Sequence, residues 1–548
     1  MRGTIIRRFR SGAGKLLRDQ RGNALMLTAA AVVPLVGIVG SAVDIGRAYM
    51  TQLRLQQACD AGVLAGRRAM AGGTYTDAAE AEANKMFNFN FPDGIYGSSG
   101  ISFASETSGK SNVVGVASAT LPTALMYIFG KDAFNLSVNC GAKLEISNVD
   151  VMMVLDVTGS MAWTNDGDTD SKIVGLRAAA KSFFATLAGA DIGDGQLRFG
   201  VVPYSATVNV GEILRKADSS WLSQSALLPS RTGIGWRDVE ECGWQGPKWN
   251  RQWVCETKSR YFYRYEDRSF AVGSLAPGGQ ITANTGTNGG NVTATWSGCI
   301  IERKTTPFGP SETAPDDAFD MDIDMVPTSD EATKWQLYIP GLTYDRGQVA
   351  PLETKSTLND MNGRSACPYK AMKLKKVVDS AAAGSETEVD QAGFDSYIDK
   401  LQPTGQTYHD VGMAWGARLI SPNGLFASEN VDASGRPIDR HIVFMTDGQM
   451  DTRLDYLSHQ GVEASMSRTG ATDKNDSDDR HNNRFLQLCE RAREKGITIW
   501  VVSFGIDSNA QLDSCASSGA AFAAKNTAQL TEQFQSIARQ ISRLRLSK

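Results

Sequence analysis

Three stretches of this sequence set carboxylates and hydroxyls at the ends of apolar runs or in tight turns. Asp156, Thr158 and Ser160 directly follow an apolar run, and Asp447 ends a second one. Thr407 lies in a turn that precedes a helical pattern. Oxygen ligands of this kind suit Mg²⁺, with Mn²⁺ or Ca²⁺ as alternatives. Because a loop as short as 156–160 cannot encircle an ion, we expect the two later stretches to supply the remaining ligands.

The elements that position these residues can be read from the surrounding patterns. The apolar runs 151–155 and 442–445 are short and continuous, which is typical of strands buried on both faces of a parallel sheet. Amphipathic helical patterns separate such runs, for example at 172–187 and 410–419. This alternation predicts an α/β fold with an open sheet, and ligands bind at the carboxyl ends of the strands in such sheets.

Asp156-x-Thr158-x-Ser160, Thr407 within Gly-Gln-Thr, and Asp447-Gly together resemble the metal-ion-dependent adhesion site of von Willebrand factor A (VWA) domains, with Thr158 where Ser is usual. The resemblance implies a doubly wound, Rossmann-like VWA fold. It implies that Asp156, Ser160 and Thr407 contact the metal directly or through water. Thr158 and Asp447 would complete the shell, and a carboxylate of a partner protein would take the open position. The alternative is a strand-to-helix turn whose polar residues only cap a helix.

The charge and hydropathy pattern of the N-terminal residues predicts a membrane anchor. Residues 1–21 are basic, and residues 22–43 carry no charge. About 20 apolar residues span a bilayer as a helix. The basic flank predicts a cytoplasmic tail at 1–21, a transmembrane helix at 22–43 and a periplasmic remainder on a bacterial inner membrane. The alternative is a cleaved signal peptide, with Gly40 and Ala42 as small residues at the cleavage site.

The segment from about 18 to 70, including Gly22–Met50 and the later L-Q-Q-A-C-D-A-G-V-L-A-G, is similar to TadG proteins of the tight-adherence (Flp-type) pilus assembly system. The stretch W-G-x-R-L-x-S-P at 415–422 also looks like TadG. Unlike related TadE-type pseudopilins, this chain has no acidic residue shortly after Gly22. The resemblance implies pilus or envelope assembly proteins as partners and a pilin-like stem.

The length and the net charge indicate how the chain is organised into domains and which partners it excludes. The chain has 548 residues and a net charge of −4, which indicates several domains and no nucleic-acid binding. We expect a stem and small α+β unit at 44–147 and a VWA domain at 148–548. Asp156 and Thr407 are 251 residues apart, whereas two βα units need far fewer, so an insertion is expected at about 216–366.

The insertion is rich in Trp and Gly, and it contains an acidic run at 316–324. We expect the tryptophans to build a small core of the insertion's own, with a binding surface as the alternative. The acidic run is expected to be a solvated loop, with a calcium site as the alternative. The run 473–479 is expected to be a polar loop before a helix at 484–495, and the Asp-rich stretch 166–170 to be a solvated loop. Eight cysteines outside a membrane predict disulfides: Cys489 with Cys515, Cys59 with Cys140, and the other four, Cys242, Cys255, Cys299 and Cys367, within the insertion.

The sequence does not favour an enzyme or a small-molecule substrate. Its four histidines are scattered and form no H-E-x-x-H motif, and no P-loop is present; His409 is expected at the surface. Asp156-x-Thr158-Gly faintly resembles aspartyl-phosphate enzymes, but Val157 stands where those pumps carry Lys. Two non-enzymatic functions remain: a membrane-anchored pilus assembly component that binds a partner protein through the metal site, and a surface adhesin that binds an external ligand.

Overall fold

The computed structural model describes residues 20–70, 75–108, 112–143, 148–190, 195–345, 354–355, 358–363, 365, 367–432, 435–507 and 509–546. They form two compact units, Met1–Glu145 and Ile146–Lys548. The basic tail predicted at 1–21 lies outside the described residues except for its last two positions.

The first unit packs two helices on an antiparallel sheet. Helix α2, Gln20–Ala69, is long and apolar enough from Met26 onward to cross a membrane. Helix α3, Asp77–Asn90, and the Cys59–Cys140 disulfide tie α2 to the sheet. The sheet comprises β1, Ser99–Ser108, β2, Asn112–Pro122, and β3, Ala133–Lys143, in that order. Strand β1 was not predicted because its sequence is mostly polar and only Ile101 and Phe103 alternate as apolar residues.

Asp44 fixes the loop between β2 and β3 to α2. Its buried carboxylate accepts hydrogen bonds of 2.7–2.8 Å from the backbone N–H groups of Ala124, Leu125 and Met126. These groups open a 3₁₀ turn at Met126–Phe129. An acidic side chain thus satisfies three orphan donors at a turn start, where negative charge is favourable.

The second unit is built on one mixed sheet. Its order is β14-β13-β5-β4-β15-β18-β19, and every neighbouring pair is parallel except β13 with β5. The strands are β4, Asn148–Asp156; β5, Leu197–Tyr204; β13, Met372–Val377; β14, Glu388–Val389; β15, Ile438–Thr446; β18, Ile497–Phe504; and β19, Ala521–Ala524. Without the two-residue edge strand β14, the chain order 3-2-1-4-5-6 is that of a doubly wound fold.

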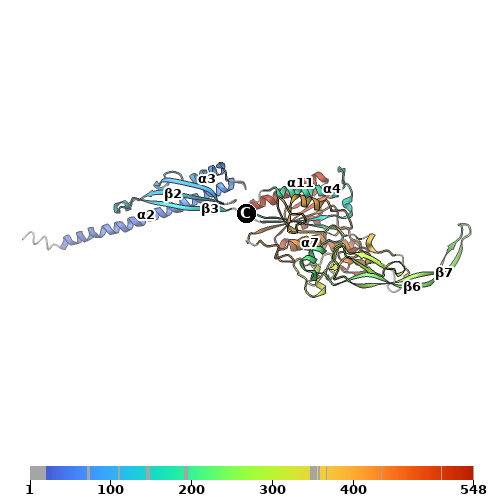
Figure 1. Ribbon diagram of the computed structural model, residues 1–548. Coiled ribbons are helices and arrows are strands. Elements are labelled where there is room, and N and C mark those ends of the chain that lie inside the picture. Colours follow the sequence, from blue (N-terminus) through green and yellow to red (C-terminus); the bar gives the residue numbers. More distant parts are fainter. Residues whose placement is uncertain are drawn as a thin grey trace, which may run out of the picture. The chain divides into compact units, whose positions relative to one another are not determined.

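Helices cover both faces of this sheet (Figure 1). Side chains of β4 alternate between two buried clusters: Val151, Met153 and Leu155 point into one, and Met152 and Val154 into the other. The first cluster lies under α4, Lys172–Ala188, α6, Gln391–Ile398, and α11, Thr527–Leu546; the second under α7, His409–Ile420, α9, Lys474–Glu494, and α10, Ala510–Cys515. The predicted α/β fold is confirmed.

Helix α7 lies unusually close to β4. A Cβ added to Gly416 would come within 2.4 Å of Val154 Cγ2, and one added to Gly412 within 2.7 Å of the Tyr204 ring. The two glycines are four residues apart and therefore share one helix face. This close approach brings the N-terminus of α7, and the turn before it, to the carboxyl ends of the strands.

The buried tryptophans of the insertion do not form a separate core. Trp296 and Trp335 are fully buried in the same cluster as Trp415 of α7. Glu302 joins them, because its carboxylate accepts hydrogen bonds from both Trp335 and Trp415 and pairs with Arg418 at 2.7 Å. The prediction that the tryptophans build this small core is wrong, since the buried ones pack against α7; a small separate cluster of the insertion consists of tyrosines instead.

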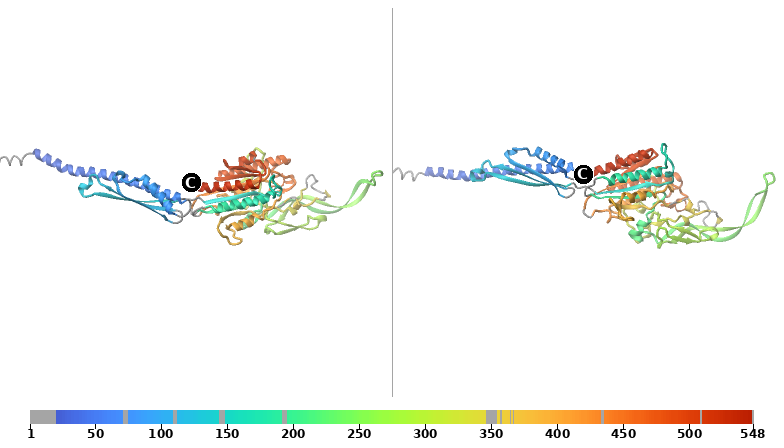
Figure 2. Two further views of the ribbon diagram at one scale, coloured as in Figure 1. Left: turned by 90° about the horizontal axis from the view of Figure 1, so that it is seen from above. Right: turned by 45° about the horizontal axis from the view of Figure 1, so that its top comes forward.

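A long hairpin leaves the body of this unit (Figure 2). It consists of β6, Ser225–Gln245, and β7, Gln252–Ala271, closed by the Cys242–Cys255 disulfide. Disulfides Cys299–Cys367 and Cys489–Cys515 complete the predicted set, all of which is confirmed. The remaining short elements are α5, Gly211–Asp218; β8, Gln280–Ala283; β9, Val292–Thr295; β10, Ile300–Ile301; β11, Gln336–Leu337; β12, Thr354–Lys355; β16, Leu457–Ser458; β17, Gly461–Val462; and α8, Glu463–Met466.

Three acidic stretches predicted as solvated or polar loops are structural instead. Asp473 caps α9 by accepting from the N–H groups of Asn475 and Asp476, so α9 begins ten residues before the predicted helix start. Asp320 is buried and pairs with Arg484. Asp168 accepts from the backbone and hydroxyl of Thr527 at the start of α11. In each stretch, a partner distant in the sequence or an orphan helix donor takes up the carboxylate.

Gly416→Ala tests the close packing of α7 on β4. Although Ala favours helix by about 1 kcal/mol over Gly, its methyl group must displace the stiff Val154, so we expect a net loss of about 1–3 kcal/mol in the free energy of unfolding. Denaturation monitored by tryptophan fluorescence measures it. Gly243→Ala, where an added methyl meets no atom within 4 Å, is the control; equal effects of the two changes would contradict the packing argument.

Candidate functional site: a carboxylate and hydroxyl cluster at the switch point of the sheet

The sequence-predicted site residues lie where the strand order of the sheet reverses. Strands β5 and β13 extend the sheet on one side of β4, and β15, β18 and β19 extend it on the other. Asp156 is the last residue of β4, and Asp447 directly follows β15, its parallel neighbour. The two carboxylates therefore meet at the carboxyl edge of the sheet, in the crevice where doubly wound proteins bind ligands.

Four of the five predicted residues are linked by hydrogen bonds. The N–H of Thr158 donates to Asp156 Oδ1 at 2.9 Å. The hydroxyls of Thr158 and Ser160 are 3.0 Å apart, and Ser160 donates to Asp447 Oδ1 at 2.8 Å. This chain of contacts joins residues almost three hundred positions apart, as the spacing of the motifs predicts.

Thr407 reaches the same edge through backbone contacts. The N–H of Gly159 donates to Gly405 O at 3.0 Å, and the N–H of Thr404 donates to Val157 O at 2.7 Å. Gly405 takes a positive φ of 74°, which glycine adopts without strain. Thr407 is 5% exposed. In the described part of the chain, its hydroxyl makes no hydrogen bond to the other four residues.

Two further residues contact Asp156 and a third contacts one of them; the sequence pattern did not identify these three as part of the site. Thr446 donates to Asp156 Oδ2 at 2.8 Å, and the Tyr204 hydroxyl donates to the same oxygen at 3.3 Å. His409 Nε2 lies 3.0 Å from the Thr446 hydroxyl. The prediction that His409 lies at the surface is wrong: it is 2% exposed, and burial lowers its pKa to about 4. In the sequence, the position of Thr446 directly before Asp447 could have identified it as a residue of the site.

Lys172 is the fourth missed residue. It is the first residue of α4, and its ammonium lies 3.0 Å from Asp447 Oδ2 at 7% exposure. A cation at a helix N-terminus is unfavourable toward the helix dipole, so a lysine at this position signals a partner carboxylate. Lys172 supplies the site with one positive charge.

That charge does not fully compensate the two carboxylates. Burial, together with the nearby negative charge of Asp447, raises the pKa of Asp156 to about 7. Its oxygens face hydroxyls and an N–H group, and the pair has one lysine. The cluster therefore combines hard oxygen donors with an excess of negative charge, the chemistry that fits a divalent cation.

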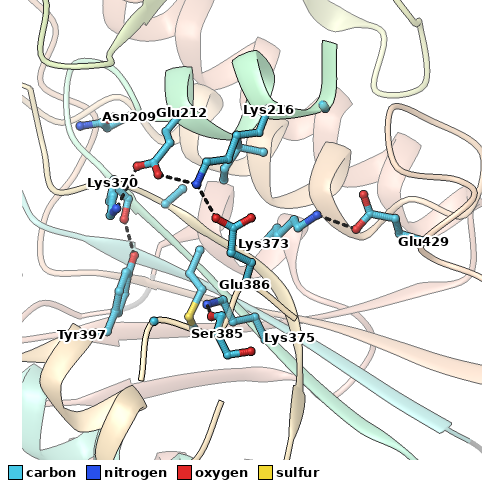
Figure 3. A pocket seen from close by; sticks show the side chains of 15 residues that line it. Asn209, Glu212, Lys216, Lys370, Lys373, Lys375, Ser385, Glu386, Tyr397 and Glu429 are labelled. Atoms are coloured by element: carbon cyan, nitrogen blue, oxygen red, sulfur yellow. Dashed lines mark hydrogen bonds and ion pairs between the residues drawn. The ribbon is translucent and has the colours of Figure 1, made fainter. Parts of the chain in front are cut away.

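A second polar depression lies away from this edge, beside α5 and β13. It is a pocket of about 430 Å³ lined by Lys216, Lys370, Lys373 and Lys375 among others. Figure 3 shows its charges pairing: Lys216 with Glu212 and Glu386, Lys370 with Glu212, and Lys373 with Glu429. Because carboxylates and a backbone carbonyl take up the four ammonium groups, the pocket offers no strong anion site.

One protein-family model matches a short N-terminal part of the chain. Residues 22–79 match the family model described as putative Flp pilus-assembly TadE/G-like. A comparison with curated proteins gives no match.

Solved structures resemble the chain only distantly. They include the pilus adhesin SpaC of Lactobacillus rhamnosus GG, with 10% identity, 81% of this chain covered and a TM-score of 0.31. The chain spans 34% of the length of SpaC. The vWF domain of the type V pili tip protein Mfa5 of Porphyromonas gingivalis has 11% identity, with 72% of this chain and 95% of that domain covered and a TM-score of 0.28.

A third similar structure is that of proximal thread matrix protein 1 from the mussel byssus with zinc in its metal-ion-dependent adhesion site (MIDAS) motif. It has 10% identity, with 72% of this chain and 46% of that chain covered and a TM-score of 0.26.

The strand order and the polar cluster at the switch point define the second unit as a VWA-type domain. In addition, residues 22–79 of the chain match the TadE/G-like pilus-assembly family model.

Lys172→Met tests the charge balance of the cluster. Removing one partner of a buried ion pair leaves Asp447 uncompensated next to Asp156, so we expect a loss of about 3 kcal/mol in the free energy of unfolding in metal-free buffer. Lys181→Met on the same helix removes a pair that is 28% and 58% exposed and should cost less than about 1 kcal/mol. Chemical denaturation compares them, and a smaller loss for Lys172→Met would contradict the role assigned to Lys172.

Proposed function

We propose that this protein is a membrane-anchored component of Tad-type pilus assembly whose VWA-type domain binds a partner protein through a divalent cation. The observation that carries the proposal is the hydrogen-bonded cluster of Asp156, Thr158, Ser160 and Asp447 at the switch point. Thr407 faces the same edge from the turn before α7. The TadE/G-like match at the N-terminus supports the pilus context.

Asp156, Ser160 and Thr407 would hold the ion, with Mg²⁺ favoured and Mn²⁺ or Ca²⁺ as alternatives. The ion would supply an electrophilic centre with an open position, and a carboxylate of the partner protein would complete its shell. Lys172 already engages one oxygen of Asp447, and Ser160 the other. These contacts support a role for Asp447 through the Ser160 hydroxyl or water.

The apolar part of α2 supports a single-pass anchor. Large apolar side chains between Met26 and Ile45 are exposed, with Met26 at 71% and Ile38 at 70%. Together with the basic N-terminal sequence, this pattern supports an inner-membrane protein with a cytoplasmic N-terminus and a periplasmic bulk.

A binding role fits this site better than phosphoryl transfer. Asp156 is fully buried, and both of its oxygens accept hydrogen bonds from Thr158, Thr446 or Tyr204. Oδ1, which accepts from the N–H of Thr158, keeps a second lone pair that a small cation can use, whereas in-line phosphoryl transfer needs room for a whole phosphate group beside the oxygen. The packing around Asp156 supports a non-enzymatic function.

Metal titration of the full chain in detergent tests the site. We expect Mg²⁺ at a hundred times its Kd to stabilise the VWA-type unit by about 2.7 kcal/mol, read as a rise in melting temperature. Asp156→Asn and Thr407→Val should lose this rise because each removes a ligand.

Asp166→Asn is the matched control, since this exposed carboxylate lies in the loop that follows the site. It should keep the full response to metal. A parent chain whose melting temperature does not move with Mg²⁺, Mn²⁺ or Ca²⁺ would refute the metal site. In the producing bacterium, a gene encoding Asp156→Asn should fail to restore pili to a deletion strain, whereas Asp166→Asn should restore them.

The hairpin of β6 and β7 favours a second candidate function, adhesion to an external ligand. Four of its tryptophans are well exposed: Trp236 at 59%, Trp244 at 62%, Trp249 at 88% and Trp253 at 58%. Exposed aromatic clusters of this kind mark interaction surfaces. The Cys242–Cys255 disulfide fixes the strands that present them.

Replacing the four exposed tryptophans by Ser separates the two functions. If the protein is an assembly component only, pili should form normally and adhesion of cells should stay unchanged. If the hairpin binds an external ligand, adhesion should fall at least tenfold while pili remain. Gln245→Ala with Gln252→Ala, at exposed polar positions of the same hairpin, is the control. Counting pili by electron microscopy and adherent cells by plating measures both outcomes.

A further inference from the structure

Behind the switch point, three metal-ligating side chains from three different elements meet in the interior. Asp410 lies on α7, His481 on α9, and His459 in the turn between β16 and β17. Asp410 Oδ2 is 2.6 Å from His481 Nδ1 and 3.3 Å from His459 Nε2, and one ligand atom of each residue lies within 4.8 Å of the other two. All three residues are at most 3% exposed.

The tautomer of His459 leaves no hydrogen between its Nε2 atom and the carboxylate of Asp410. His459 Nδ1 lies 3.3 Å from Ala206 O, so this nitrogen carries the hydrogen that a carbonyl requires. In a neutral imidazole the other nitrogen, Nε2, then presents a lone pair, and it faces the carboxylate of Asp410. Two lone pairs at that distance repel each other. Either an additional proton or a metal ion must lie between His459 and Asp410.

The surroundings match those of a metal ligand set. A histidine ligand ordinarily donates its second N–H to a carbonyl or carboxylate, which fixes the ring and its tautomer; Ala206 O does this for His459. The Tyr408 ring packs edge-on against both imidazoles, with centroids 5.3 Å and 4.9 Å away. Asp410 Oδ1 is buried and has no hydrogen-bond partner among the described residues. It is therefore free to serve as a further ligand atom.

We infer that Asp410, His459 and His481 form a buried structural site for a transition metal ion of the zinc class, separate from the oxygen-only cluster at the switch point. Two imidazoles and a carboxylate select zinc or its transition-metal neighbours over Mg²⁺ and Ca²⁺. Tetrahedral zinc with bonds of about 2.0–2.1 Å separates its ligand atoms by about 3.3 Å. His459 Nε2 is already at this distance from Asp410 Oδ2. His481 Nδ1 would have to move away from the same oxygen by only ~0.7 Å.

Such an ion would fasten the parts that position the adhesion-type cluster. Asp410 is three residues from Thr407, and the β16–β17 turn accepts a backbone hydrogen bond of 2.7 Å from Glu302 of the insertion to His459 O. The ion would therefore join the N-terminus of α7, helix α9 and the insertion at one point. Removing it would loosen the Thr407 turn while leaving Asp156 and Ser160 in place.

Metal analysis of the full chain, purified in detergent without a histidine tag and dialysed against zinc and then against a weak chelator, tests the inference. We expect one zinc per chain in the parent protein. His459→Gln and His481→Gln should each lower the zinc content at least tenfold. His441→Gln, at a buried histidine on β15, and Asp156→Asn should both retain it, which separates this site from the switch-point cluster.

Cobalt substitution gives a readout that does not depend on the variants folding. The parent protein loaded with Co²⁺ should show the intense visible absorption of four-coordinate cobalt with imidazole ligands, and Mg²⁺ should not displace it. A parent protein that retains less than a tenth of an equivalent of zinc, or whose cobalt spectrum is that of the hydrated ion, would overturn the inference. The cluster would then be a protonated imidazole–carboxylate network.

Discussion

Two buried carboxylates at the ends of neighbouring parallel strands are the constraint around which the VWA-type unit is arranged. Burial, together with the negative charge of Asp447, raises the pKa of Asp156 to about 7. Hydroxyls of Ser160 and Thr446, an N–H of the 156–160 loop and the ammonium of Lys172 hold the pair in place. These donors come from three separate stretches of the chain, the 156–160 loop, the start of α4 and the end of β15, so they meet only when the sheet and α4 are assembled.

Packing on the α7 face explains how distant stretches reach this edge. Gly412 and Gly416 let α7 approach β4 closely, and α7 carries Thr407 at its entrance and Asp410 in its first turn. On its other side, α7 contributes Trp415 and Arg418 to the buried carboxylate of Glu302. A buried ion pair is stable only when its remaining hydrogen bonds are made, and here the insertion completes them. The insertion is thus a structural part of the domain.

Six of the seven tryptophans of the insertion fall into two groups that differ in burial; the seventh, Trp221, is partly buried. Trp296 and Trp335 are buried and donate their N–H groups to Cys299 O and Glu302. The four on the hairpin are more than half exposed, and two of them, Trp244 and Trp253, pack edge to face across the strands at 5.5 Å. The same residue type is thus buried in the core in one place and exposed to solvent in another.

The sequence by itself determined the features that depend on local pattern: the buried strands, the amphipathic helices, the apolar N-terminal helix and the D-x-T-x-S turn. The even number of cysteines indicated disulfides, and the positions of the cysteines beside predicted elements suggested the pairs Cys59–Cys140 and Cys489–Cys515, which the structure contains. Tertiary structure alone decided which side chains meet across the sheet, because contacts such as Lys172 with Asp447, or His459 and His481 with Asp410, join residues with no periodic relation. Burial of Asp320 and His409 followed for the same reason: a polar residue goes inside only where a distant partner satisfies it.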